Sequence, residues 1–83
     1  MEELRDKINE IDDKLVTLFI ERMEIADKIG AYKRERGLPV YDRSREQAVL
    51  ARLTDSVEPE FADYIKTLYN AIFEMSRAYQ EFC

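Results

Sequence analysis

The sequence has no histidine and a single cysteine, Cys83, at its last position. Without a second thiol no internal disulfide can form, and we expect Cys83 to be a frayed terminal thiol. The missing histidine removes the usual proton shuttle near neutral pH, and together with the lone cysteine it removes any ordinary transition-metal site. These absences argue against covalent chemistry and against a bound metal.

Long apolar runs are also missing, since no stretch approaches the length that spans a membrane. The N-terminus, MEELRDKINE, is charged from its start, so we expect no secretory signal and a cytoplasmic location. The formal net charge of −5 disfavours nonspecific nucleic-acid binding, which needs an excess of basic side chains. The chain of 83 residues, 46% apolar and 37% charged, therefore reads as one small amphipathic domain over residues 1–83.

Glycine and proline are scarce, with two of each, and they separate the predicted helices. The first helix covers about residues 4–33 and ends in RERGLP, where Gly37 suits a left-handed cap and Pro39 prevents continuation. After the connector GLPVYD, a second helix begins near Asp42 or Ser44, either of which can cap it, and it runs through RSREQAVLARL.

Apolar spacing predicts which faces of the second and third helices point inward. On the second helix these positions are Val49, Leu50 and Leu53. The third helix follows the break TDSVEPE, begins near Pro59 and continues to the end of the chain. Its apolar positions alternate four and three apart, at Phe61, Ile65, Leu68, Ile72, Met75, Tyr79 and Phe82.

The first helix carries an apolar seam along its whole length. Two interleaved heptad series form it: Leu4, Ile11, Leu18, Ile25 and Tyr32, and Ile8, Leu15 and Ile29. Thirty helical residues span about 45 Å, whereas a compact globule of this size is only about 30 Å across. The other two helices offer too little surface to cover the seam, so we predict an all-α homodimer that pairs the long helices.

Arg22 interrupts this seam where an apolar residue belongs. It can snorkel or pair with a nearby glutamate, the commoner outcomes for a long side chain, or it can meet an anionic ligand. Lys33 lies about 20° around the helix and roughly 16 Å along it, so the two could bracket a small dianion, although a cation at a helix C-terminus is favourable by itself. Arg5 lies roughly 25 Å before Arg22, so only a partner chain could bring it to the same small site.

Polar residues on the other helices point toward the same interior. Glu46 extends the inward stripe of the second helix, Arg45 borders that face, and Asp42 can cap the helix. An ordinary polar first turn would explain these three residues by itself. Ser76 and Gln80 each follow an apolar position of the third helix, so they either face a cavity or lie at the edge of the core.

Three segments together carry a resemblance to a known family: LRDKINEIDDKLVTLFIERMEIADKIGAYK, then GLPVYDRSRE, then EMSRAYQ. The chain resembles the small all-helical chorismate mutases over essentially its whole length. The resemblance implies three helices per chain in an intertwined homodimer, with each active site completed by an arginine from the partner's first helix. It also implies that chorismate is rearranged to prephenate, in phenylalanine and tyrosine biosynthesis, without any cofactor.

The resemblance implies a role for each site residue. Arg5 of the partner and Arg22 would hold the two carboxylates of chorismate, and Lys33 and Gln80 would donate to its ether oxygen, Lys33 reaching a neighbouring carboxylate as well. The remaining residues would complete the pocket: Glu46 with Asp42 would receive the ring hydroxyl, Arg45 would order that acidic end, and Ser76 would assist at a carboxylate. No residue would act as nucleophile or proton shuttle.

Two features depart from familiar bacterial members of the family. The connection TDSVEPE is slightly shorter, and only three residues follow Gln80, so fraying could weaken the contact that this residue makes. We also expect a free-standing enzyme with no attached domain and no end-product regulation of its own, although a partner protein could provide such regulation.

Three other interpretations stay open. An isochorismate pyruvate lyase has a similar fold and cationic pocket, and it fits the same residues. A dimeric helical interaction module would explain the heptads but not Arg22 within the seam. A nucleic-acid-binding helical dimer has only the basic run KRER in its favour, against an acidic total charge.

Overall fold

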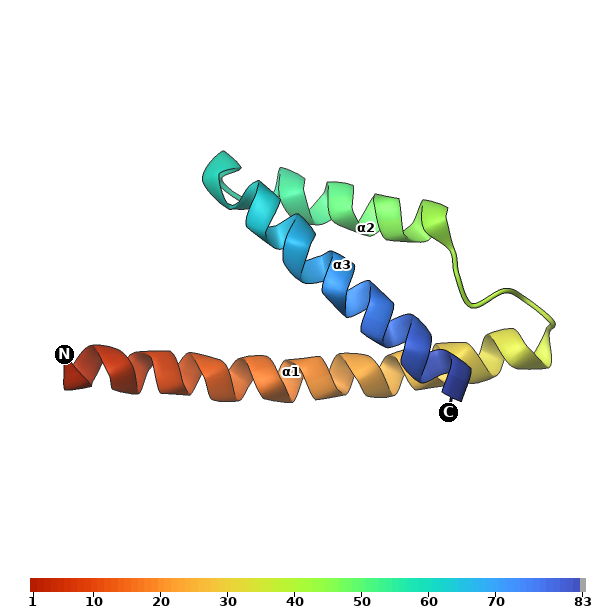
Figure 1. Ribbon diagram of the computed structural model, residues 1–83, viewed down its shortest axis with the longest axis horizontal. Helices are drawn as coiled ribbons and strands as arrows, with labels where there is room; N and C mark the ends of the chain where they lie inside the picture. The colour runs from red at the N-terminus through yellow and green to blue at the C-terminus, as the bar shows by residue number, and fades with distance from the viewer. Residues whose placement is uncertain (83) are drawn as a thin grey trace.

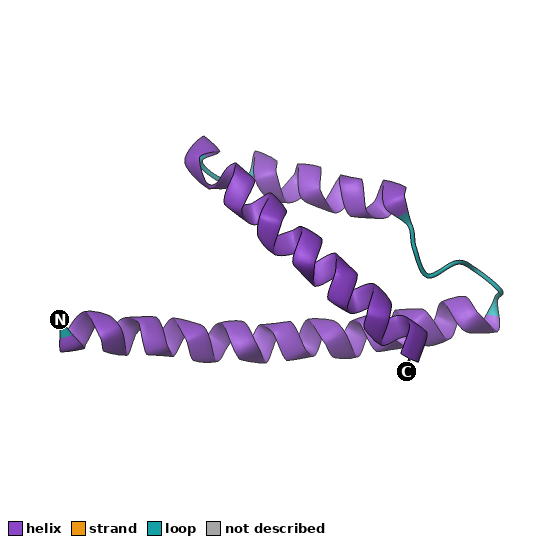
Figure 2. Ribbon diagram, viewed as in Figure 1, coloured by secondary structure: helices purple, strands orange, loops and turns teal. Residues whose placement is uncertain are grey.

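The computed structural model describes residues 1–82, which form three helices and no strand (Figures 1 and 2). Helix α1 spans Glu2–Glu35, α2 spans Arg43–Asp55 and α3 spans Pro59–Phe82. The predicted all-α fold with a long first helix is confirmed, although α1 and α2 extend about two residues beyond their predicted ends. Cys83 and the side chain of Phe82 lie outside the described part, so the expectations for them stay predictions.

The two helix ends that the sequence marks form as predicted. Gly37 has a φ of 65°, and its N–H donates to the carbonyl of Arg34, while the N–H of Leu38 donates to the carbonyl of Lys33. This pair of bonds is a Schellman motif, which ends α1. Asp42, not Ser44, caps α2, because its carboxylate accepts a hydrogen bond from the backbone N–H of Arg45 at 3.0 Å.

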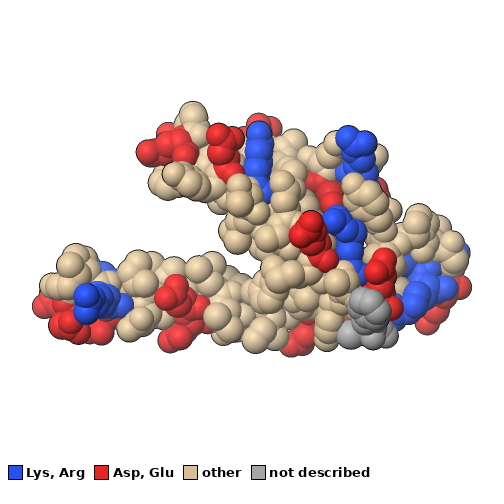
Figure 3. Space-filling view, in the orientation of Figure 1, with Lys and Arg blue, Asp and Glu red and all other residues tan. Residues whose placement is uncertain are grey.

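Helix α3 lies between the other two helices and holds them together. It packs against α1 and against α2, whereas α1 and α2 do not pack on each other within residues 1–82 (Figure 1). Helix α1 sets the longest dimension, 52 Å. Its N-terminal half projects beyond the α2–α3 pair and leaves a wedge-shaped opening (Figure 3). None of the three helices is long and apolar enough to cross a membrane within the described range.

The core of one chain is small and matches the predicted faces only in part. Its buried apolar side chains are Ala26, Val49, Ile72 and Phe73. The prediction that Val49, Leu50 and Leu53 face inward is confirmed, since the first is buried and the others half-buried.

Most of the predicted apolar positions of α1 and α3 are exposed in one chain, although on α3 the predicted Ile72 is buried and Ile65 is half-buried. On α3 the exposed positions are Phe61, Leu68, Met75 and Tyr79. On α1 they are Leu4, Ile8, Ile11, Leu15, Leu18, Ile25, Ile29 and Tyr32. Besides Ile72, the buried side of α3 includes Phe73, Ser76 and Gln80, each one position after a predicted apolar position. Helices α1 and α3 thus each have one apolar side that their own chain leaves uncovered.

The surface area and the radius of gyration of the single chain also indicate uncovered apolar surface. Its accessible surface is 6840 Å², whereas a compact protein of this length exposes about 5,200 Å². Its radius of gyration is 15.4 Å, against about 12 Å for a compact chain. One copy therefore leaves apolar area uncovered that a stable fold would bury.

Candidate active site

A pocket of about 280 Å³ opens where the C-terminal halves of α1 and α3 meet the start of α2. It is lined by seven of the eight predicted site residues, from all three helices and the α1–α2 connector: Arg22, Lys33, Asp42, Arg45, Glu46, Ser76 and Gln80. Apolar lining comes from Ile25, Ile29, Val49 and Phe73, among others. Residues far apart in the sequence thus share one small cavity of the kind that binds small molecules.

Arg22 forms part of the α1 wall. Its Nη1 donates to the hydroxyl of Ser76 at 3.0 Å, and its guanidinium lies 5.6 Å from the ring centre of Tyr69 and 5.8 Å from that of Phe73. No acidic residue within positions 1–82 pairs with it. The half-buried cation is therefore held by a hydroxyl and two aromatic rings, and its charge is available to an anion.

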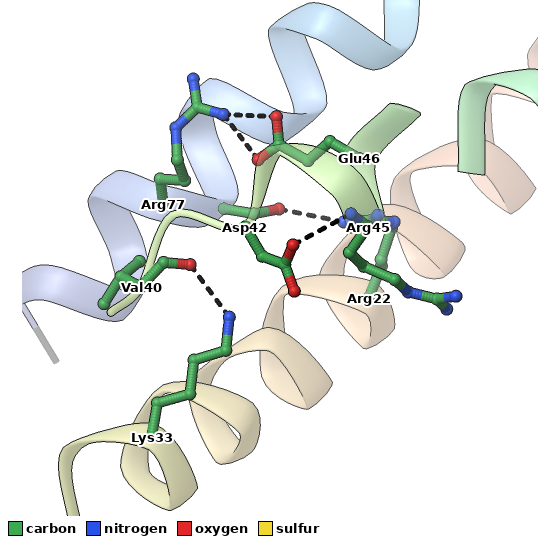
Figure 4. Close-up of polar contacts among 8 residues, drawn as sticks. Arg22, Lys33, Val40, Asp42, Arg45, Glu46 and Arg77 are labelled. Carbon is green, nitrogen blue, oxygen red and sulfur yellow. Dashed lines mark hydrogen bonds and ion pairs between the residues drawn. The ribbon is translucent and has the colours of Figure 1, made fainter. Parts of the chain in front are cut away.

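Lys33 lies in the last turn of α1, two residues before its end, and points toward the connector (Figure 4). Its Nζ donates to the backbone carbonyl of Val40 at 2.9 Å. An ammonium group has three donors, so two remain for a ligand. Like Arg22, Lys33 has no acidic partner within the described residues.

Gln80 is buried, with 7% of its surface exposed, and three contacts fix it against α1. Its Nε2 donates to the carbonyl of Ala26 at 3.0 Å, which leaves one amide hydrogen free to donate. Arg34 donates to its backbone carbonyl. Gly30 permits the close approach, because an added Cβ would lie 3.0 Å from the Cβ and Cγ of Gln80. The short C-terminus therefore does not prevent an ordered Gln80 contact.

The opposite wall is acidic and belongs to the start of α2. Asp42 is occupied as the helix cap, and the side chain of Arg45 lines the pocket beside it. Glu46 lies half-buried on the first turn of α2. Cations on α1 thus face carboxylates on α2 across the cavity, with no direct ion pair between these two helices in the described part.

Sequence reasoning missed Arg77, which binds Glu46 (Figure 4). Its Nη1 lies 2.6 Å from both carboxylate oxygens, and its guanidinium lies 4.7 Å from the ring centre of Tyr41. The hydrogen bond to Glu46 is the main cause that raises the pKa of Arg77 above its usual value. Its position was informative, because residue 77 lies four after the buried Phe73 and three before Gln80, on one side of α3.

Arg5 lies outside this pocket. It is on the first turns of α1, largely exposed, and its Nη1 lies 3.6 Å from Glu2. Seventeen residues separate it from Arg22, which corresponds to about 25 Å along the helix. Within one chain, the structure does not bring Arg5 to the other seven residues.

Metal ligation receives no support from the geometry. No group of three or more His, Cys, Asp or Glu side chains is placed to hold an ion among residues 1–82. What the pocket offers is three cations without acidic partners among the described residues, a buried amide, a hydroxyl and carboxylates, a set that fits a small polar anion carrying a hydroxyl group.

Comparison with known proteins gives consistent matches. Residues 4–81 match the family Chorismate mutase type II. A bifunctional chorismate mutase/prephenate dehydratase of Escherichia coli K12 is 39% identical over 75 residues, which cover 88% of this chain and 19% of that protein. A chorismate mutase of Methanocaldococcus jannaschii is 37% identical over 51 residues, covering 61% of this chain and 52% of that protein.

Another relative carries a different name. A 3-dehydroquinate dehydratase of Pyrobaculum aerophilum is 31% identical over 77 residues, covering 93% of this chain and 23% of that protein. No solved structure gives a match. The chain spans about a fifth of the length of the Escherichia coli relative. The family match covers nearly the whole chain, which confirms the resemblance found from the sequence: the chain belongs to the chorismate mutase type II family.

Proposed function

We propose that this protein is a chorismate mutase, an isomerase that rearranges chorismate to prephenate in phenylalanine and tyrosine biosynthesis. The observation that carries the proposal is the pairing of Arg22 and Lys33, two cations without acidic partners in the described chain, with Gln80 in one pocket. Chorismate carries two carboxylates, and its reacting ether oxygen gains negative charge as the carbon–oxygen bond breaks. Fixed donors stabilise both kinds of charge.

The reaction is unimolecular, so the residues need to hold one conformer and stabilise one developing charge. Arg22, with Ser76 beside it, takes one carboxylate. The two free Nζ donors of Lys33 and the free amide hydrogen of Gln80 serve the ether oxygen, and Lys33 also reaches a neighbouring carboxylate. Glu46 receives the ring hydroxyl at the other end of the pocket. No step needs a nucleophile, a proton shuttle or a cofactor.

Asp42 and Arg45 shape the acidic end. Asp42 fixes the start of α2 by capping it, which holds Glu46 on the first helical turn. Arg45 balances the local negative charge. Their roles are therefore mainly in placing the acceptor of the hydroxyl group.

We further propose an intertwined homodimer in which Arg5 of each chain serves the partner's pocket. The uncovered seam on α1, the uncovered side of α3 and the excess accessible surface of one chain support it. Arg5 lies too far from the pocket of its own chain to serve it, which supports a role for Arg5 in the pocket of the partner chain. A second copy would also cover the open side of the cavity and exclude water, which strengthens the electrostatic contacts within it.

The test is the loss of chorismate absorbance with purified protein and no added cofactor, with prephenate identified as product. Incubation with isochorismate in parallel asks whether pyruvate is released, which would identify a lyase. If the protein converts neither substrate and does not bind a bicyclic transition-state mimic, a helical interaction module becomes the better description. The cytoplasmic location and a regulatory partner protein stay predictions.

A further inference from the structure

We infer that Arg77 is a positioning residue, which holds the carboxylate of Glu46 in the pocket wall so that it can receive the hydroxyl group of the substrate. The inference rests on the proposed function, because it concerns the same pocket. Arg77 lines the pocket together with Glu46.

The contact geometry leaves Glu46 both fixed and usable. Nη1 of Arg77 lies 2.6 Å from each of the two carboxylate oxygens, so the carboxylate is gripped symmetrically by one nitrogen. Each oxygen can accept more than one hydrogen bond, so capacity remains for a ligand hydroxyl. The side chains are 29% exposed for Arg77 and 22% for Glu46, so solvent competes only in part for the bond.

Arg77 is itself held in place on its other side. Its guanidinium lies over the ring of Tyr41, in the connector that leads into α2, at 4.7 Å from the ring centre. On α3 it lies between Ser76 and Gln80, both buried in the pocket lining. A single side chain thus ties the acceptor of the hydroxyl group to the helix that carries the proposed ether-oxygen donor.

The arrangement of the helices makes this tie important. Helices α1 and α2 do not pack on each other in the described chain, so the distance between the cationic and acidic walls depends on α3 and the connector. Among residues 1–82, the Arg77–Glu46 ion pair is the one ion pair that joins two different helices. Without it, Glu46 can rotate toward solvent, and the start of α2 loses its polar attachment to α3.

The expected kinetic consequence is a fall in kcat larger than the rise in KM. Arg22 and Lys33 still bind the carboxylates, so substrate still enters. Without a fixed Glu46 carboxylate to accept its ring hydroxyl, the substrate also binds in conformers that do not react. Misplacement of a substrate in this way lowers the reaction rate by about 10-fold to 100-fold.

The experiment is a double-mutant cycle of Arg77→Ala, Glu46→Gln and the double variant, with kcat, KM and affinity for a bicyclic transition-state mimic measured for each. If Arg77 acts through Glu46, Arg77→Ala lowers kcat about 10-fold or more in the wild-type background and changes it less than 2-fold in the Glu46→Gln background. Arg77→Lys, which keeps a donor and the charge, restores part of the loss.

Arg36→Ala is the matched control. Arg36 also stacks on a tyrosine, 3.6 Å from the ring centre of Tyr32, and pairs with Glu35 at 3.7 Å, but it lies outside the pocket. Its removal should leave kcat and KM unchanged. If Arg77→Ala does not fold by circular dichroism, Arg77→Gln takes its place in the cycle with the same expectation.

The inference would be overturned if Arg77→Ala keeps the wild-type kcat, or if it lowers kcat by the same factor in the wild-type and Glu46→Gln backgrounds. The proposed function would still be supported in that case, provided that the wild-type protein converts chorismate. If wild-type protein neither converts chorismate nor binds the mimic, the proposed function fails, and the inference fails with it.

Discussion

The two halves of α1 share one apolar pattern but have different surroundings. In the C-terminal half, residues 19–35, Ala26 and Gly30 are buried against α3, and the half carries two of the cations that line the pocket, Arg22 and Lys33. In the N-terminal half, residues 2–18, every residue is exposed, including Leu4 at 60% and Leu15 at 57%. The same spacing therefore has two settings: one half lines a pocket within the chain, and the apolar positions of the other half are not covered by their own chain.

The largest effect is expected from a charge in the uncovered half. Leu15→Asp would place a carboxylate in the proposed dimer interface, where an unpaired charge is costly, and should abolish both dimer and turnover. Light scattering after size-exclusion chromatography measures the oligomeric state, and the chorismate assay measures turnover. Thr17→Asp adds the same charge off the seam and should stay dimeric and active. A dimeric, active Leu15→Asp protein would show that the seam has another use.

In the packed half, Arg22→Leu should separate stability from activity. It removes the charge that interrupts the seam, so thermal stability stays the same or rises, while turnover is lost with the carboxylate contact. Thermal melts and the chorismate assay test the two effects. A stable and fully active Arg22→Leu protein would refute the assignment of this residue to the site.

Combining lesions from the two halves tests whether they meet across the dimer. Arg5→Ala and Lys33→Ala proteins should each be nearly inactive, Lys33→Ala by about 10²-fold or more. After the two are unfolded and refolded together, half the dimers are mixed by chance, and each mixed dimer has one intact site. About a quarter of wild-type activity should return, given random pairing and independent sites.

The mixing experiment has a clear negative outcome. If Arg5 served the pocket of its own chain, every site in the mixture would carry one lesion. No recovery, with mixed dimers confirmed by mass spectrometry, would therefore exclude the shared site.

The smallest effect concerns how closely the packed half approaches α3. Gly30→Ala puts a Cβ 3.0 Å from Gln80, a cost of about 1–3 kcal/mol that is partly offset by about 1 kcal/mol of helix propensity. The melting temperature should fall by roughly 4–8 °C for each kcal/mol of net stability lost, and turnover should fall several-fold because Gln80 moves. Gly37→Ala, which meets no atom within 4 Å but strains a φ of 65°, should lower stability without lowering turnover.

Local rules and periodicity account for what the sequence predicted. Asp42 and Gly37 act through bonds to residues within four positions, so their neighbours in the sequence were sufficient to place both helix ends. Heptad spacing likewise identified the apolar side of α1. Apolar spacing could not identify which helix covers which side. A helix that contacts two neighbours has two apolar faces, and the spacing of its apolar residues indicates only one mean direction between them. On α3 this direction missed the buried Phe73.

The site was predicted by its residue types and only partly by its contacts. Seven of the predicted residues line the pocket. Helical spacing placed Glu46, Ser76 and Gln80 on or beside inward faces, and the family resemblance supplied the set as a whole. Arg77 was missed because an arginine next to a core position resembles a solvated surface residue, and its partner Glu46 is 31 positions away. Pairing across such a separation depends on how α2 lies on α3, which no local pattern specifies.

The uncovered seam of α1 has a consequence for the rate of folding. Helical turns form within microseconds from local bonds, but in the proposed dimer the exposed apolar side chains of residues 2–18 would gain their burial only when a second chain arrives. Recovery of the native state from denaturant should therefore be second order in protein, slower on dilution and faster on concentration. Newly made chains at low abundance would wait longest, so activity in a dilute solution should rise with a lag that shortens as more protein is added.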